Sequence, residues 1–146
     1  MHDETNFSGS AEEWLRFAQS DLEIARIEPP PAVMLEGLCF HAQQAAEKAI
    51  KAVLIANSKP FPKTHNISTL LDLLPDNLNI PDEVQEATIL TDYSVMTRYP
   101  GAIEPVEEDE YWHAIHLAAA VVSWAQKLLA NKFDDSRELN AEDKEV

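Results

Sequence analysis

The sequence predicts an all-α protein, an up-and-down bundle of four long helices plus one short helix. Apolar residues recur at helical spacing over four long segments, and the prolines lie between these segments. Only three glycines occur in 146 residues, which is too few for the turns of an all-β fold. The length and the hydrophobic share of 45% fit one globular domain.

The first helix is expected to begin after Ser10, which can act as its N-cap. Glu13 stands three residues later and completes a capping box. A buried face is predicted from the helical spacing of Trp14, Leu15, Ala18, Leu22 and Ala25. The run Pro29 to Pro31 ends this helix, because each proline lacks a backbone donor and restricts the residue before it.

The second helix is predicted over residues 32–56 and has two different faces. Its packing face consists of small and apolar side chains, among them Leu35, Cys39, Ala42, Ala46, Ile50 and Val53. Alanines allow neighbouring helices to approach closely, and a thiol in this apolar setting is inert. The opposite face carries the polar side chains of His41, Gln44, Lys48 and Lys51.

A proline-containing loop and a short helix come next. The loop spans residues 57–64 and places Phe61 between two prolines, where we expect an exposed ring. The short helix is predicted over residues 66–74, with Thr64 or Asn66 as its cap.

Two further long helices complete the predicted bundle. One begins at Pro81 and should end near Arg98, before a proline and a glycine. The last is predicted from about Val106 to Lys132 and opens with four acidic residues, which suit the positive end of the helix dipole. Its two apolar stripes require two partners, the bundle core and a second surface that we interpret as a candidate subunit contact.

The predicted domain organisation is simple. Residues 1–9 are expected to be disordered, residues 10–132 to form the bundle, and residues 133–146 to be a charged, frayed tail. The chain has no segment near the roughly 20 apolar residues of a membrane span and no basic–apolar leader. A single cysteine forms no internal disulfide. These features favour a cytoplasmic location and no membrane contact.

Charge and motifs narrow the possible functions. The net charge of −15 disfavours non-specific binding of nucleic acid through a basic face. The chain lacks a Gly-x-Ser-x-Gly elbow, a phosphate loop and a His-Glu-x-x-His motif. Glu110 and His113 have the spacing of a di-iron ligand pair, but such a site needs a second copy of the motif, and the sequence has none. We therefore predict no metal and no cofactor.

One cluster of polar residues remains as a candidate site. The topology can bring together His41, Gln44, Lys48, Lys51, Thr64, His65, Arg98 and Tyr99. Together they offer hydrogen-bond donors, a guanidinium suited to phosphate and an aromatic face for a base. The alternative reading is that the lysines only solvate a helix face.

Four blocks follow one another along the chain, namely CFHAQQAAEKAIKAVL, KTHNISTLL, TRYPG and a final apolar helix, and the segment WLRFAQSDLEIA precedes them. Over roughly Glu13 to Leu129 this order resembles the HEPN domain of prokaryotes. The resemblance implies a helical bundle that forms a homodimer and binds nucleotides or RNA. It also implies a minimal nucleotidyltransferase as partner, in a toxin–antitoxin type pair.

Many HEPN proteins are metal-independent ribonucleases that use an arginine followed four to six residues later by a histidine. Arg98 matches that arginine, but residues 102–105 are Ala, Ile, Glu and Pro, so the histidine is absent. His41, His65 or His113 could replace it in space. The sequence therefore favours a nucleotide- or RNA-binding module. An endoribonuclease toxin using Arg98 is the alternative, and a non-catalytic dimeric adaptor is the second alternative.

Overall fold

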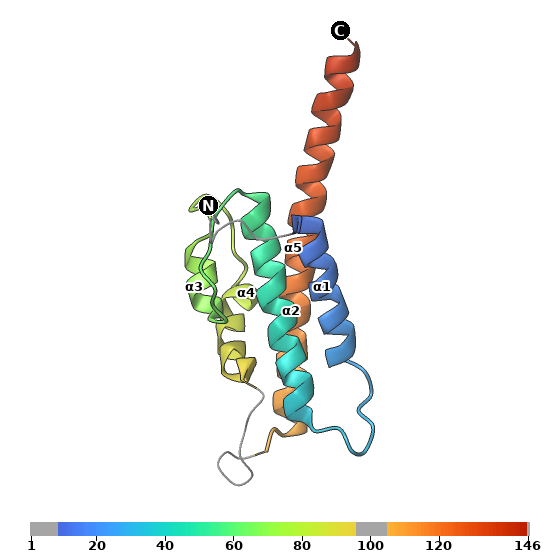
Figure 1. Cartoon of the computed structure of the whole chain (residues 1–146), viewed down its shortest axis with the longest axis vertical. Helices are drawn as coiled ribbons and strands as arrows, with labels where there is room; N and C mark the ends of the chain where they lie inside the picture. The colour runs from blue at the N-terminus through green and yellow to red at the C-terminus, as the bar shows by residue number, and fades with distance from the viewer. Residues whose placement is uncertain (1–8, 96–104, 146) are drawn as a thin grey trace.

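The computed structural model describes residues 9–95 and 105–145, with side chains described as far as Lys132 in the last helix. This part of the chain is helical, without a strand. Its elements are α1 (Ala11–Ala25), α2 (Leu35–Ala56), α3 (Ile67–Asp72), α4 (Asp82–Glu86), the 3₁₀-helix η1 (Ala87–Ser94) and α5 (Glu108–Glu145). In Figure 1, α1, α2 and α5 are the three long helices of the bundle. The short helices α3, α4 and η1 together take the place of a fourth long helix, and we call this group the fourth leg. The predicted all-α, up-and-down bundle is confirmed.

Helix α1 begins as its sequence predicts. The Ser10 hydroxyl accepts a hydrogen bond from the Glu13 N–H at 3.2 Å, and the Glu13 carboxylate accepts one from the Ser10 N–H at 3.3 Å. The buried residues of its inner face include Ala18, Leu22 and Ala25. The helix ends at Ala25, ahead of the proline run.

Helix α2 is the central helix of the bundle and packs against α1, α5 and the fourth leg. Ala42, Ala45, Ala46 and Ala49 are completely buried, as is Cys39, which fits close approach of neighbouring helices. The helix begins at Leu35 rather than at residue 32. The three residues before it are excluded from the helix because Val33 closes a turn, donating its N–H to the Pro30 carbonyl at 2.9 Å.

The fourth leg differs from the single helix expected from Pro81 to about Arg98. Only α4 is α-helical, and η1 follows as a 3₁₀-helix that ends at Ser94. Ala87, Leu90 and Tyr93 are buried. Their spacing of three residues suits a 3₁₀-helix, because its side chains at i and i+3 lie in line. Burying all three therefore favours the tighter helix over the α-helix that the sequence predicted.

Helix α5 begins at Glu108 and continues to Glu145, past the end expected near Lys132 and through the segment expected to be frayed. Its C-terminal part projects beyond the other helices (Figure 1). Both of its apolar stripes are buried within this chain, since Leu117 and Val121 of the second stripe are also fully covered. Trp124 of this stripe donates its indole N–H to the Asn79 carbonyl at 3.4 Å. The second stripe is therefore covered by the protein's own fourth leg, and our reading of it as a subunit contact is wrong.

The ends of the helices near the start of α5 are joined by three hydrogen bonds. Glu36 of α2 accepts from the Val106 N–H at 2.7 Å, and the Tyr93 hydroxyl donates to Glu110. The buried Tyr111 hydroxyl donates to the Ala25 carbonyl at 2.6 Å. Across the described ranges, none of the helices has the length and apolar character needed to cross a membrane.

Candidate functional site

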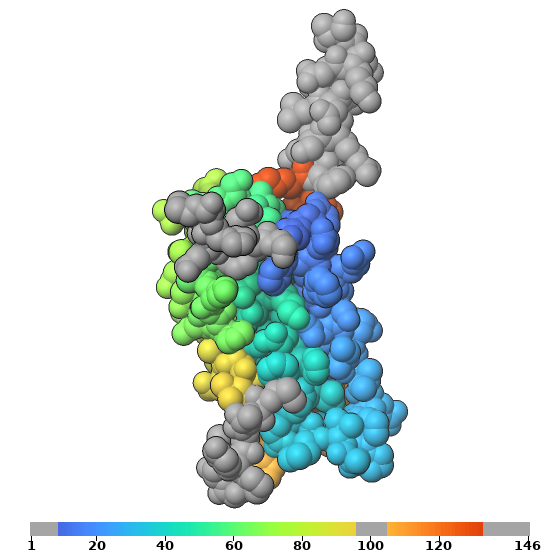
Figure 2. All heavy atoms as spheres, in the orientation of Figure 1, coloured from blue at the N-terminus to red at the C-terminus, as the bar shows by residue number. Residues whose placement is uncertain are grey.

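A row of polar side chains follows α2 between α1 and the segment that leads to α3. We call this row the polar seam. It consists of Asp21, His41, Gln43, Gln44, Glu47, Lys48, Lys51 and His65. In Figure 2 the surface of α2 is visible as a strip between α1 and the region of α3. The seam therefore lies along a face where α2 reaches the surface.

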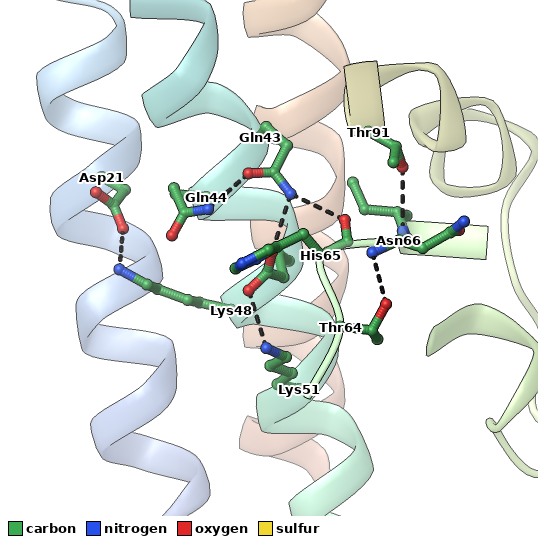
Figure 3. Close-up of polar contacts among 11 residues, drawn as sticks. Asp21, Gln43, Gln44, Lys48, Lys51, Thr64, His65, Asn66 and Thr91 are labelled. Carbon is green, nitrogen blue, oxygen red and sulfur yellow. Dashed lines mark hydrogen bonds and ion pairs between the residues drawn. The ribbon is translucent and has the colours of Figure 1, made fainter. Parts of the chain in front are cut away.

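The Asp21 cluster, made of Asp21, His41 and Lys48, joins α1 to α2. Asp21 is buried, and each of its carboxylate oxygens has a partner. Oδ1 lies 3.0 Å from His41 Nδ1, and Oδ2 accepts a hydrogen bond from Lys48 Nζ at 2.7 Å. The side chains of His41 and Lys48 remain 31% and 26% exposed. Figure 3 shows Lys48 reaching across from α2 to Asp21 on α1. This cluster holds an imidazole and an ammonium group together at the edge of solvent.

The Glu47 cluster, made of Glu47, Lys51, Gln43 and His65, repeats this arrangement deeper in the bundle. Glu47 Oε2 accepts from Lys51 Nζ at 2.9 Å, and Oε1 lies 2.9 Å from His65 Nδ1. Gln43 donates to Oε1 at 2.9 Å and also to the His65 carbonyl at 3.2 Å. The side chains of Glu47 and Lys51 are only 4% and 9% exposed. Here the carboxylate and the ammonium are inside the protein, and only the imidazole faces outward.

Two aromatic rings cover the Lys51 ammonium. Its Nζ lies 5.7 Å from the centroid of Trp14 and 5.5 Å from that of Phe61, within the range of cation–π attraction. The two rings meet edge to face with centroids 6.5 Å apart. Phe61 is only 2% exposed, so the expectation of an exposed ring is wrong. The Phe61 ring packs over a buried charge, and this contact holds the loop after α2 against the bundle.

The pKa of the Glu47 carboxyl is lowered from its ordinary value. Burial acts to raise this pKa, because it disfavours the charged form. The hydrogen bonds from Lys51 and Gln43, the positive charge of Lys51 and the contact with His65 outweigh burial. Glu47 is therefore an ionised carboxylate at neutral pH, with its charge balanced inside the protein.

Gln44 extends the Glu47 cluster along α2. Gln44 donates to the Gln43 carbonyl oxygen at 2.7 Å (Figure 3), and Gln43 in turn donates to Glu47. Hydrogen bonds therefore link Gln44 and Lys51 of the predicted face to the loop before α3, whereas His41 and Lys48 bond to α1. The described part of the chain leaves no buried side-chain polar atom without a partner.

The structure brings together five of the predicted site residues, namely His41, Gln44, Lys48, Lys51 and His65. Thr64 has a different role. Its hydroxyl accepts a hydrogen bond from the Asn66 N–H at 3.1 Å, next to the start of α3. Lys51 belongs to the seam, but its ammonium is buried and does not face a ligand. Arg98 and Tyr99 lie outside the described residues, so their place in the site stays a prediction.

Sequence reasoning missed the two carboxylates that organise the seam. Asp21 precedes the buried Leu22 and lies three residues after the buried Ala18. A carboxylate at such a position on the inner face of a helix needs a partner, and this signal could have found it. Glu47 lies four residues from both Gln43 and Lys51, the spacing at which helical side chains meet.

The histidines at the start of α5 face α4 instead of the seam. His113 lies 3.7 Å from Glu86, and His116 lies 3.5 Å from Glu83, with all four side chains substantially exposed. Within residues 9–95 and 105–145, no group of three or more histidine, cysteine or acidic side chains is placed to hold a metal ion. These surface pairs connect α5 to the fourth leg.

Fold and site together define a small all-α bundle protein in which buried carboxylates hold histidine and lysine side chains at a solvent-facing edge. A family model of the HEPN domain matches residues 11–128. The chain therefore belongs to the HEPN domain family, as its four sequence blocks indicate.

Two solved structures resemble this fold. The protein TT1696 of Thermus thermophilus is 30% identical, with a TM-score of 0.66, over 80% of this chain and 96% of that one. ST0689, described as an archaeal HEPN homologue, is 28% identical, with a TM-score of 0.63, over 82% of this chain and 98% of that one. A search of curated proteins gives no significant match.

Proposed function

We propose that this protein is a HEPN module that binds a nucleotide or RNA through the polar seam and Arg98. We further propose that it acts in the cytoplasm as a homodimer and as the HEPN partner of a minimal nucleotidyltransferase, in a toxin–antitoxin type system. The observation that carries the binding proposal is the pairing of His41 and Lys48 by one buried carboxylate. Family membership supports the proposed partner and the dimer.

The net charge of −15 makes such a local site important. A surface of this sign repels phosphate groups at long range. Binding must therefore depend on short-range hydrogen bonds from groups held in place, which the seam provides. Lysines spread over the surface would not offset this repulsion, because the protein has only 11 lysines and arginines against 26 acidic residues.

Arg98→Ala should weaken the binding of ATP by about tenfold or more, since a hydrogen bond to a charged group contributes about 1.5–3 kcal/mol. Isothermal titration calorimetry measures this directly. A matched control is Arg26→Ala, which removes an exposed arginine at the end of α1 that pairs with Glu23 and should leave the affinity unchanged. If the unaltered protein binds neither ATP nor RNA up to millimolar ligand, the binding proposal is wrong.

The endoribonuclease reading is favoured by one specific feature. His41 is an imidazole oriented by Asp21, which is the kind of group that the segment after Arg98 lacks. General acid–base help of this kind contributes about 10²–10⁴-fold in rate. Expression of the chain alone in bacteria should then arrest growth and cleave cellular RNA, and His41→Gln should abolish both effects. Normal growth with intact RNA would remove this reading and leave the binding module.

A further inference from the structure

We infer that the Asp21 cluster is a proton-coupled phosphate site, in which Lys48 and His41 bind one phosphate group and His41 takes up a proton as that group arrives. The inference rests on the proposed function, because it names the part of the nucleotide or RNA that the seam holds. It adds the ionisation change that accompanies binding.

The first step is the orientation of the imidazole. With Asp21 ionised, His41 Nδ1 must carry the hydrogen that is shared with Oδ1 across 3.0 Å. This fixes the tautomer, as carboxylate partners of histidine commonly do. The remaining nitrogen, Nε2, is then the atom that gains or loses a proton. Because the side chain is 31% exposed, His41 is open to solvent and to a ligand.

The second step is the charge of the cluster. Asp21 and Lys48 cancel each other, so the cluster has no net charge while the imidazole is neutral. A phosphate monoester carries about −1.5 to −2 charges at pH 7. Adding a proton at His41 Nε2 makes the cluster positive and turns Nε2 into a charged donor. Charge-assisted hydrogen bonds of this kind are about twice as strong as neutral ones, so binding of phosphate and uptake of a proton favour each other.

The groups around His41 fit this scheme. Asp21 faces it from α1, and Lys48 lies on its own helix as the second partner of the same carboxylate. Its ring also meets the edge of Phe40, with centroids 5.5 Å apart. Gln44 lies on α2 between His41 and Lys48 in sequence, and is half-buried with its amide directed to Gln43. The ammonium group of Lys48 has three donors, and one serves Asp21.

The Glu47 cluster has the same connections but a different role. Its lysine ammonium is buried beneath Trp14 and Phe61, so a phosphate cannot reach both the imidazole and the ammonium. His65 is 65% exposed and contacts its carboxylate through Nδ1. It is therefore a matched control for His41, because the two histidines share a type of partner and differ in access to a lysine.

The test is calorimetric titration of the full-length protein with ATP at pH 8, in several buffers of different ionisation enthalpy. At this pH the ligand phosphates are well above their second pKa of about 6, so proton uptake reports on the protein. The unaltered protein should take up protons as ATP binds. His41→Gln should lose that uptake and bind about tenfold more weakly, as expected for one charge-assisted hydrogen bond. Lys48→Met should also weaken binding but keep the uptake, and His65→Gln should change neither.

The outcomes separate the inference from the function on which it rests. If ATP binds with the same proton uptake in the unaltered protein and in His41→Gln, the inference is overturned and the proposed function stands. Loss of uptake in His65→Gln instead would assign the coupling to the Glu47 cluster and also overturn it. If the unaltered protein binds no ATP, both fail. Circular dichroism identifies a variant that has lost its fold, and if His41→Gln does so, His41→Asn supplies the comparison.

Discussion

Glu47→Ala should lower the free energy of unfolding by about 3–5 kcal/mol, the usual cost of removing one partner of a buried ion pair. The Lys51 ammonium would stay inside the protein without its counter-charge, between two aromatic rings. Gln43 and His65 would also lose the oxygen that they share. Urea denaturation followed by circular dichroism measures the change.

The paired replacement of Glu47→Leu with Lys51→Met serves as the control. Replacing both charges by apolar side chains of similar volume is often close to neutral, so the double variant should be more stable than Glu47→Ala. A double variant that is as unstable as the single one would show that the buried charge is not the cause.

The same cluster should make stability depend on pH in the acid range. The folded pKa of Glu47 is lowered, so the carboxylate binds a proton less readily in the folded state than in the unfolded one. Its contribution is therefore present above the ordinary glutamate pKa of about 4.3 and is lost as the pH falls through the lowered folded value. The stability difference between the unaltered protein and Glu47→Gln should shrink over this range.

Phe61→Ala is expected to have an effect of similar size, about 3–5 kcal/mol, as is usual for a large buried ring. Removing the ring leaves a cavity and opens the Lys51 ammonium to water on one side. Thermal and urea unfolding both measure the loss. Phe17→Ala is the matched control, because Phe17 is 56% exposed on α1 and should change stability by no more than about 0.5 kcal/mol. Equal effects in the two variants would contradict the buried role of Phe61.

The parts of the fold that follow from local chemistry were predictable from the sequence. The capping box of Ser10 and Glu13 needs only residues three apart, and the buried alanines of α2 follow from helical spacing. The 3₁₀ geometry of η1 was not predictable, because it depends on which of Ala87, Leu90 and Tyr93 the rest of the bundle buries. The burial of Phe61 likewise depends on Lys51, which lies on another element.

In the candidate site, too, the features set within one helix were predictable, and those set by packing between helices were not. Helical spacing predicted that His41, Gln44 and Lys48 share a face, because all three lie on one helix. It did not predict that Asp21 holds two of them, since the register between α1 and α2 is set by packing. The contribution of Arg98 and Tyr99 stays a prediction, which the calorimetric experiment with Arg98→Ala addresses.

The short helices of the fourth leg also affect which part of the bundle can open locally in the folded state. Long helices such as α2 are opened only by breaking many backbone hydrogen bonds together, whereas α3, α4 and η1 are each at most eight residues long. Segments of this kind undergo local opening at a lower free energy than the global unfolding of a domain. We therefore expect the fourth leg, which packs against α5 through α4 and η1, to open more readily than the three long helices. Amide hydrogen exchange should then be faster in α3, α4 and η1 than in α2.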